Sequence, residues 1–292
     1  MQNNTLSENT SVSSNQVNIG KIGRVLLQLG KISPEDTNTI LRVQQEHNML
    51  FGDAALKLGL INEADISQAL ALQFNYPYLQ AGQGNYSSEL VAAYQPFSKQ
   101  VEALRALRSQ LMVLWFNQRN KSLAIVSSNA GEGVSYLTAN LAIMFSQLGE
   151  RTLLIDANMR DPRQQKMFNL KENHGLSDII AERAGLEAIK KVEFFEDLSV
   201  LGAGTIPPNP QELLNRVRFS HFMSYARSKY DIVLVDASPA KLSADAQVTA
   251  AHCSGALLVS RLNHTCLSDI AEVRNQIAVT GAHVVGAVIN EF

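Results

Sequence analysis

Residues 123–162 read LAIVSSNAGEGVSYLTANLAIMFSQLGERTLLIDANMRDP, and this stretch decides the fold. An apolar run, LAIVSS, leads into a loop that contains Gly131 and Gly133, and a helical pattern follows the loop. A second apolar run, TLLID, ends at Asp156. A glycine-rich turn between a strand and a helix can hold phosphate, because its backbone N–H groups converge on an anion at the helix N-terminus. We therefore predict a phosphate-binding loop over residues 128–135.

The alternation of strand and helix continues beyond this stretch to the end of the chain. Amphipathic helical stretches separate apolar runs of strand character, which predicts an α/β fold of the P-loop NTPase type, with a mostly parallel sheet and helices on both faces. Ligands of such sheets bind at the carboxyl ends of the strands, where the loop, Asp156 and Asp236 all fall. The predicted strands are residues 123–128, 152–156, 198–203, 231–236, 256–260 and 283–290.

Residues 21–73 contain an internal repeat with a period of 29 residues. Eight residues recur in fixed register, for example Gly23 as Gly52 (52 − 23 = 29) and Gln44 as Gln73 (73 − 44 = 29). Within each copy the apolar spacing is helical, a glycine stands where a helix would end, and an aspartate stands near the next helix start. We expect two helix pairs that pack into a small all-α domain. The glycines are Gly30 and Gly59, and the aspartates are Asp36 and Asp65.

Composition and length set the class of protein and its compartment. The 292 residues suffice for about two domains, and the net charge of −2 argues against nucleic acid as the main partner. Only two cysteines, Cys253 and Cys266, are present, which favours a reducing compartment. No apolar run approaches the ~18 residues that a membrane-spanning helix needs, and the N-terminus lacks the order of a signal peptide. We expect a cytoplasmic protein.

The chain divides into four predicted regions. The first is a disordered tail whose Asn, Ser, Thr and Gln residues cannot bury enough surface to order themselves. The α-helical repeat domain follows, then a linker with a short helical piece, and finally the P-loop domain. The regions are residues 1–18, 19–80, 81–98 and 99–292.

Polar residues at the strand ends carry the predicted chemistry. Gly131 and Gly133 leave room for phosphate, and Ser135 can ligate Mg²⁺ at the start of the helix. Asp156 ends one buried strand and can hold Mg²⁺ or accept a proton from a substrate hydroxyl, although a helix cap is the alternative reading. Asp236 ends another buried strand, as a Walker-B carboxylate does.

Four motifs occur together in the second half of the chain. They are SSNAGEGVS (127–135), IDANMR (155–160), EALRALR (102–108) and PPNPQELL (207–214). From Gln95 to Phe292 the chain resembles the bacterial tyrosine kinases that regulate polysaccharide chain length. Together with the repeat domain, it resembles the EpsG-type kinases of exopolysaccharide systems.

The resemblance implies ATP and Mg²⁺ as cofactors, and a membrane-bound chain-length determinant as a partner that recruits the protein to the inner membrane. It implies a homo-oligomeric ring built through Glu102, Arg105 and Arg108. The implied catalytic residues are Asp156, Asp236 and Arg160. The implied Mg²⁺ ligands are Ser135, Asp156 and Asp236. The implied nucleotide-binding residues are Gly131, Glu132, Gly133, Val134, Ser135 and Tyr136, of which Tyr136 could instead only pack at the helix start.

Three departures from the family pattern leave two readings open. Val134 stands where the family has a phosphate-binding Lys, Asn158 replaces the second Asp of its motif, and no tyrosine follows Tyr230. A lost charge-assisted contact costs about 1.5–3 kcal/mol in binding, and more in a transition state that charge stabilises. The chain is either an ATP-binding tyrosine autokinase or a non-catalytic, ring-forming scaffold of the same family. Arg160, Arg163 and Lys166 are the nearby cations that could replace the lysine.

The repeat domain resembles the N-terminal domain of type II secretion and pilus assembly ATPases, some of which bind cyclic di-GMP. In that family a leading Arg in each copy holds the ligand, and here those positions are Lys21 and Leu50. Leu cannot grip phosphate as Arg does, so a helical docking domain without nucleotide is the alternative. A secretion ATPase or a partitioning ATPase fits the whole chain poorly, because neither explains the PPNPQELL segment.

Overall fold

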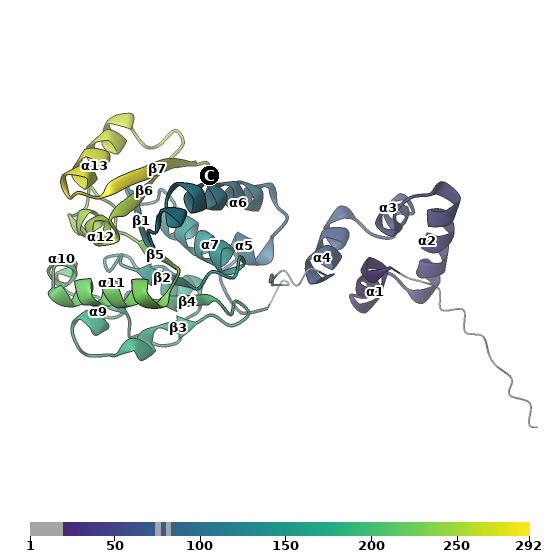
Figure 1. Cartoon of the computed structure of the whole chain (residues 1–292), viewed down its shortest axis with the longest axis horizontal. Coiled ribbons are helices and arrows are strands. Elements are labelled where there is room, and N and C mark those ends of the chain that lie inside the picture. Colours follow the sequence, from purple (N-terminus) through teal and green to yellow (C-terminus); the bar gives the residue numbers. More distant parts are fainter. Residues whose placement is uncertain (1–19, 74–76, 80–82) are drawn as a thin grey trace, which may run out of the picture. The chain divides into compact units, whose positions relative to one another are not determined.

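A computed structural model describes residues 20–73, 77–79 and 83–292, and the chain divides between Tyr76 and Pro77 into two units. The predicted disordered tail, residues 1–18, lies outside the described residues. Figure 1 shows a helical first unit and a second unit with one sheet. Each unit is described by itself.

The repeat folds into two helix pairs with the same helix ends. α1 (Lys21–Gln28) and α2 (Pro34–His47) form the first pair, and α3 (Phe51–Lys57) and α4 (Glu63–Gln73) form the second. Gly30 and Gly59 follow α1 and α3 with φ of 66° and 68°, a left-handed conformation that favours glycine. In each copy the next residue's N–H bonds back five residues, from Lys31 to Leu26 and from Leu60 to Ala55. The sequence-predicted helix ends are therefore confirmed.

The second helix of each pair begins with the same reciprocal cap. Asp36 N–H donates to the Ser33 hydroxyl at 3.1 Å, and Ser33 N–H donates to the Asp36 carboxylate at 2.8 Å. Asn62 and Asp65 repeat the exchange 29 residues later, with both distances at 3.0 Å. Such caps satisfy amide donors that a helix start leaves unpaired. One core joins both pairs through Leu26, Ile32, Ile40, Phe51, Ala54, Ala55, Ile61 and Ala69.

Seven strands form the sheet of the second unit, in the order β3-β4-β2-β5-β1-β6-β7. All neighbouring pairs are parallel except β3 with β4. The predicted α/β fold with a mostly parallel sheet is confirmed. The strands are β1 (Ser122–Ser127), β2 (Thr152–Asp156), β3 (Lys190–Lys191), β4 (Leu198–Leu201), β5 (Ile232–Asp236), β6 (Gly255–Arg261) and β7 (His283–Asn290).

Helices cover both faces of this sheet (Figure 1). Successive strand residues point to opposite faces, so Leu123 and Ile125 join a core with α6 and α7, while Ala124 and Val126 join a core with α9 to α13. The helices are α5 (Val91–Tyr94), α6 (Lys99–Leu114), α7 (Val134–Ser146), α8 (Gln164–Met167), α9 (Leu176–Ile180), α10 (Pro210–Leu214), α11 (Val217–Lys229), α12 (Asp245–Cys253) and α13 (Leu267–Val279). Two short 3₁₀ turns, η1 (Phe116–Gln118) and η2 (Leu186–Ala188), complete the elements.

Residues 83–98 pack on the second unit. Leu90 is fully buried in the α6–α7 core. The Asn140 side chain on α7 accepts from Ala92 N–H and donates to the Glu89 carbonyl, both at 2.9 Å. This segment, whose composition suggested a linker, therefore places Glu89 beside the start of α7.

Candidate functional site

The loop between β1 and α7 has the backbone of a phosphate-binding loop. Gly131 and Gly133 have φ of 76° and 91°, which side chains rarely tolerate. A Cβ at Gly131 would meet nothing within 4 Å, whereas one at Gly133 would lie 2.5 Å from Asn290 Nδ2. No side chain caps the start of α7. The first N–H groups of this helix therefore remain available to an anion.

Glu132 is a buried carboxylate that organises this loop. It accepts from Ser128 N–H at 3.0 Å, from Asn129 N–H and Nδ2 at 3.1 Å, and from the Thr265 hydroxyl at 2.6 Å. Its backbone carbonyl accepts from Asn290 Nδ2 at 2.9 Å. The loop is thereby fixed to β7 and to the turn that follows β6.

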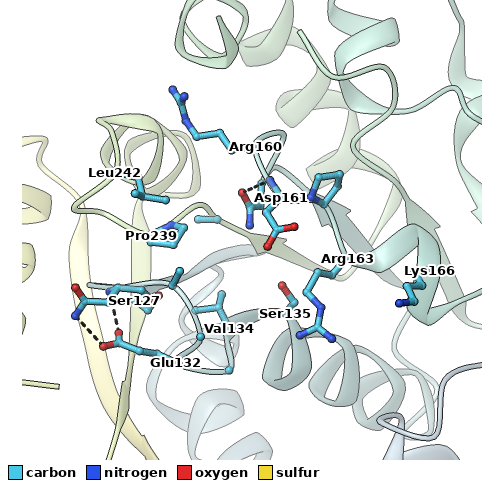
Figure 2. Close-up of a pocket in the computed structure, with 17 residues that line it drawn as sticks. Ser127, Glu132, Val134, Ser135, Arg160, Asp161, Arg163, Lys166, Pro239 and Leu242 are labelled. Carbon is cyan, nitrogen blue, oxygen red and sulfur yellow. Dashed lines mark hydrogen bonds between the residues drawn. The ribbon is translucent and has the colours of Figure 1, made fainter. Parts of the chain in front are cut away.

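A pocket of about 390 Å³ opens beside the loop (Figure 2). Val134 lies at the start of α7 with 8% of its surface exposed, and its side chain offers no donor to an anion. The pocket is lined by Ser127, residues 129–135, Asn158, residues 160–163, Lys166, Ala237, Pro239 and Leu242.

Asp156 and Asp236 end neighbouring strands and stand opposite one another in the sheet. Both carboxylates are fully buried. Asp156 accepts three backbone N–H groups, from Asn158 at 3.1 Å and from Arg163 and Gln164 at 3.0 Å. Burial and the charge of Asp236 nevertheless raise the pKa of Asp156 well above its usual value. Asp156 therefore organises the loop opposite the phosphate loop.

Asp236 keeps one carboxylate oxygen without a hydrogen-bond partner among the described residues. Its Oδ2 accepts from Gln164 Nε2 at 2.7 Å, while Oδ1 is buried and unpaired. Gln164 Nε2 also donates to the Ser135 carbonyl at 3.0 Å. Burial raises the pKa of Asp236 to about 6, although the Gln164 amide, the nearby Ser135 hydroxyl and the Arg163 charge act to lower it. An unpaired buried carboxylate oxygen is costly, which makes it a candidate ligand for a cation.

The cations at the pocket differ in how firmly they are held. Arg160 Nε donates to the buried Asp245 carboxylate at 2.8 Å, and Figure 2 shows Arg160 pointing away from the phosphate loop. Arg163 Nη2 contacts both oxygens of Glu89, at 2.9 and 3.0 Å, and Arg163 lines the pocket together with Ser135. Lys166 has no ion-pair partner in the part of the chain that the structure describes.

The structure brings most of the predicted site residues together. Residues 131–135 and Arg160 line the pocket, whereas Asp156, Asp236 and Tyr136 do not. Asp156 and Asp236 are buried at the strand ends. Asp156 comes two residues before the pocket residue Asn158, and Asp236 comes directly before the pocket residue Ala237. Burial, together with the charge of Glu89, raises the pKa of Tyr136 to about 12. Tyr136 packs against the α6–α7 core, which agrees with packing at the helix start, and its buried hydroxyl has no partner among the described residues.

The three charges predicted for a ring interface lie on α6 and make contacts within the chain. Arg105 bonds Glu102 at 2.8 Å and also donates to the Pro96 carbonyl. Arg108 Nη1 donates to the Met144 carbonyl of α7 at 3.2 Å. The Glu102 side chain is 73% exposed, whereas the side chain of its partner Arg105 is 23% exposed.

In the helical unit, the equivalent positions of the two copies meet at one cleft of about 510 Å³. Lys21 and Leu50 both line it, as do Gln44 and Gln73. Leu50 is 74% exposed, so the second copy presents an apolar side chain at the position where the first copy has Lys21.

Five residues of the site could not be identified from the sequence. Gln164 bridges Asp236 and Ser135, Glu89 pairs with Arg163, Asp245 holds Arg160, and Thr265 and Asn290 fix Glu132. None belongs to a motif, and only the fold brings them to the strand ends.

Comparison with known proteins agrees with this geometry. The family model described as cellulose biosynthesis protein BcsQ matches residues 120–278. The putative tyrosine-protein kinase CapB of Staphylococcus aureus is 34% identical over 205 residues, which cover 70% of this chain and 90% of CapB. The chain belongs to the bacterial tyrosine-protein kinase family, with a BcsQ-like domain. The tyrosine-protein kinases of Klebsiella pneumoniae and Salmonella typhi, 31% and 30% identical, are longer, and the match covers 28% of each.

Solved structures support the same assignment. The kinase domain of the Escherichia coli tyrosine kinase Etk is 27% identical with a TM-score of 0.68, covering 76% of this chain and 86% of that domain. MinD from Pyrococcus horikoshii, complexed with Mg-ADP, shares the fold at 24% identity and a TM-score of 0.52 over 58% of this chain and 70% of MinD. The comparisons give no support for cyclic di-GMP at the helical unit. No described helix is both long and apolar enough to cross a membrane.

Proposed function

We propose that this protein is an ATP-binding tyrosine autokinase-like regulator of exopolysaccharide chain length, polymerisation and export. The observation that carries the proposal is the shared position of the glycine loop, Ser135 and the unpaired Asp236 oxygen at the carboxyl ends of β1 and β5. Family membership supplies the kinase class. The residues fit a nucleotide with Mg²⁺, because the open helix start suits phosphate and Asp236 Oδ1 suits a cation.

Ser135 and Asp236 would hold Mg²⁺, which neutralises phosphate charge when bound. Asp156 is the weaker candidate as a direct ligand, since three backbone N–H groups already occupy its oxygens. Its contribution is to shape the loop that carries Arg163. We expect the protein to be cytoplasmic, to form homo-oligomers, and to act with a membrane-bound chain-length determinant, to which the helical unit could dock.

A second candidate is a non-catalytic, ring-forming scaffold of the same export machinery. Val134 removes the loop cation, and the Gln164 amide lies between Asp236 and the Ser135 carbonyl, so the site is partly filled by the protein itself. Glu102, the exposed member of the α6 charges, is the residue that would contact a neighbouring copy.

Calorimetric titration of the full chain with Mg-ATP, beside Val134→Lys, separates the two candidates. The autokinase proposal expects micromolar binding by the wild type, and phosphotyrosine that disappears in Asp236→Asn. The scaffold proposal expects no wild-type binding and rescue by Val134→Lys. Phosphotyrosine that persists in Asp236→Asn would assign the modification to another kinase.

A further inference from the structure

We propose that Arg163 supplies the phosphate-binding cation that the loop lost at Val134, and that Glu89 holds Arg163 until nucleotide binds. This inference rests on the proposed function, because it names a residue of the same nucleotide site. It predicts that the chain binds nucleotide through a cation from the loop after β2, rather than from the phosphate loop itself.

Arg160 is excluded by its partner. Its Nε bonds an Asp245 carboxylate that is 1% exposed, and the second oxygen of that carboxylate already lacks a partner among the described residues. Withdrawing Arg160 would leave a buried charge uncompensated, which is strongly unfavourable. Arg160 also points away from the phosphate loop in Figure 2.

Arg163 has a fixed backbone and a side chain that can be released. Its N–H donates to buried Asp156, so the residue stays at the edge of the pocket. The side chain is 46% exposed and its partner Glu89 is 42% exposed, and exposed ion pairs contribute little to stability. Both contacts to Glu89 use one nitrogen, Nη2. A guanidinium can bind phosphate through two nitrogens, so exchange of Glu89 for phosphate is favoured when the anion is present.

The surroundings of Arg163 put it at the pocket that would hold phosphate. Arg163 lines this pocket together with Val134 and Ser135. Its positive charge also reaches buried Asp236, where it opposes the rise in the pKa that burial causes. The backbones of Glu89 and Arg163 are held separately, by Asn140 on α7 and by Asp156, so the pair rests on its side-chain contacts alone. Turning the Arg163 side chain toward phosphate would give up these contacts.

The test is calorimetric titration of the full chain with a non-hydrolysable Mg-ATP analogue. We expect Arg163→Gln to weaken binding about tenfold or more, because a charge-assisted contact is lost. We expect Glu89→Gln to tighten binding about two- to fivefold, because Arg163 no longer has to leave an ion pair.

Two further variants serve as controls. Asp231→Asn frees Arg151 from a similar exposed ion pair, with two contacts of 2.8 Å. Arg151 and Asp231 directly precede β2 and β5, so this pair lies at the ends of the strands opposite to the site. Asp231→Asn should leave binding unchanged. Lys166→Gln removes another pocket cation and tests the competing candidate; it should weaken binding less than Arg163→Gln does. Thermal unfolding of each variant confirms that it remains folded.

The outcomes distinguish this inference from the proposed function. Wild-type binding that Arg163→Gln leaves unchanged would overturn the inference alone, as would loss of binding in Lys166→Gln instead. Absence of wild-type binding with rescue by Val134→Lys would overturn both, since Arg163 would then not replace the lysine. Weaker binding in Arg163→Gln together with tighter binding in Glu89→Gln supports the inference.

Discussion

The phosphate loop and the loop that faces it, residues 157–163, are organised in the same way but differ in their charged side chains. Each is organised by one buried carboxylate: Glu132 accepts N–H groups of the first, and Asp156 accepts N–H groups of the second. The phosphate loop offers open backbone but no cation. The facing loop carries cations that acidic partners hold. The comparison teaches that a phosphate-binding backbone does not require the lysine of the family pattern. Glu132 organises the loop backbone, whereas the lysine would stand at the position of Val134.

The largest expected effect comes from removing the carboxylate of the phosphate loop. Glu132→Gln makes the acceptor of the Ser128 and Asn129 N–H groups neutral, and it places an NH₂ where Oε1 now accepts from Asn129 Nδ2 and the Thr265 hydroxyl. We expect the free energy of unfolding to fall by about 2–4 kcal/mol, since charge-assisted hydrogen bonds are weakened and two side-chain donors face a donor. Denaturant unfolding measures this change, with exposed Glu196→Gln as the control.

Amide hydrogen exchange in Glu132→Gln tests whether the two loops are organised separately. Compared with the wild type, exchange should become faster at Ser128 and Asn129, whose N–H groups bond residue 132. It should stay unchanged at Arg163 and Gln164, whose N–H groups bond Asp156. Equal loss of protection in both loops would mean that they form one cooperative unit, contrary to the view that each is organised separately.

An intermediate effect should follow from neutralising Asp236. Burial raises its pKa in the folded protein to about 6, from the ordinary value of 3.8. The folded state therefore binds more protons than the unfolded state between these values, and stability is lost as the pH rises from about 4 through 6. Asp236→Asn should remove this loss and raise stability at pH 7 by about 2–3 kcal/mol, at 1.36 kcal/mol per pKa unit.

Unfolding of both proteins at pH 4 and pH 7 checks this expectation. The difference between wild type and Asp236→Asn should be large at pH 7 and small near pH 4. A difference of equal size at both pH values would show that packing or hydrogen bonding, rather than the carboxylate charge, causes the change. The loss of stability at pH 7 is thus the cost of keeping this carboxylate buried with one oxygen unpaired.

The sequence was sufficient to predict the sheet because buried parallel strands read as apolar runs. Each of the six predicted strands corresponds to an observed one. The additional strand β3 is a two-residue, partly exposed edge, Lys190–Lys191, and so has no apolar pattern to recognise. The helix ends of the repeat were predictable for a local reason, since glycines with positive φ and reciprocal caps depend only on neighbouring residues.

The site was predictable where local backbone geometry sets it and unpredictable where distant contacts do. The glycines and Ser135 follow from the strand–loop–helix pattern. Thr265 and Asn290, however, lie 133 and 158 residues from the Glu132 that they bind. The pairing of Arg160 with Asp245 likewise depends on the order of the strands. A serine, threonine or asparagine in a loop is common, so its type alone gave no signal.

The smallest expected effect concerns one of these distant contacts, the hydroxyl of Thr265. Thr265→Val keeps the shape but removes the donor to Glu132 at 2.6 Å and the acceptor for Arg261 N–H at 2.8 Å. We expect a loss of about 1–2 kcal/mol, because Glu132 keeps its other donors. Thr249→Val is the matched control, since that buried hydroxyl donates at 2.8 Å to the neutral Asp245 carbonyl, and it should cost less. If the two variants unfold at the same denaturant concentration, the bond to Glu132 carries no charge-assisted advantage. The phosphate loop would then be organised by its own residues and by Asn290 of β7, without the turn that follows β6.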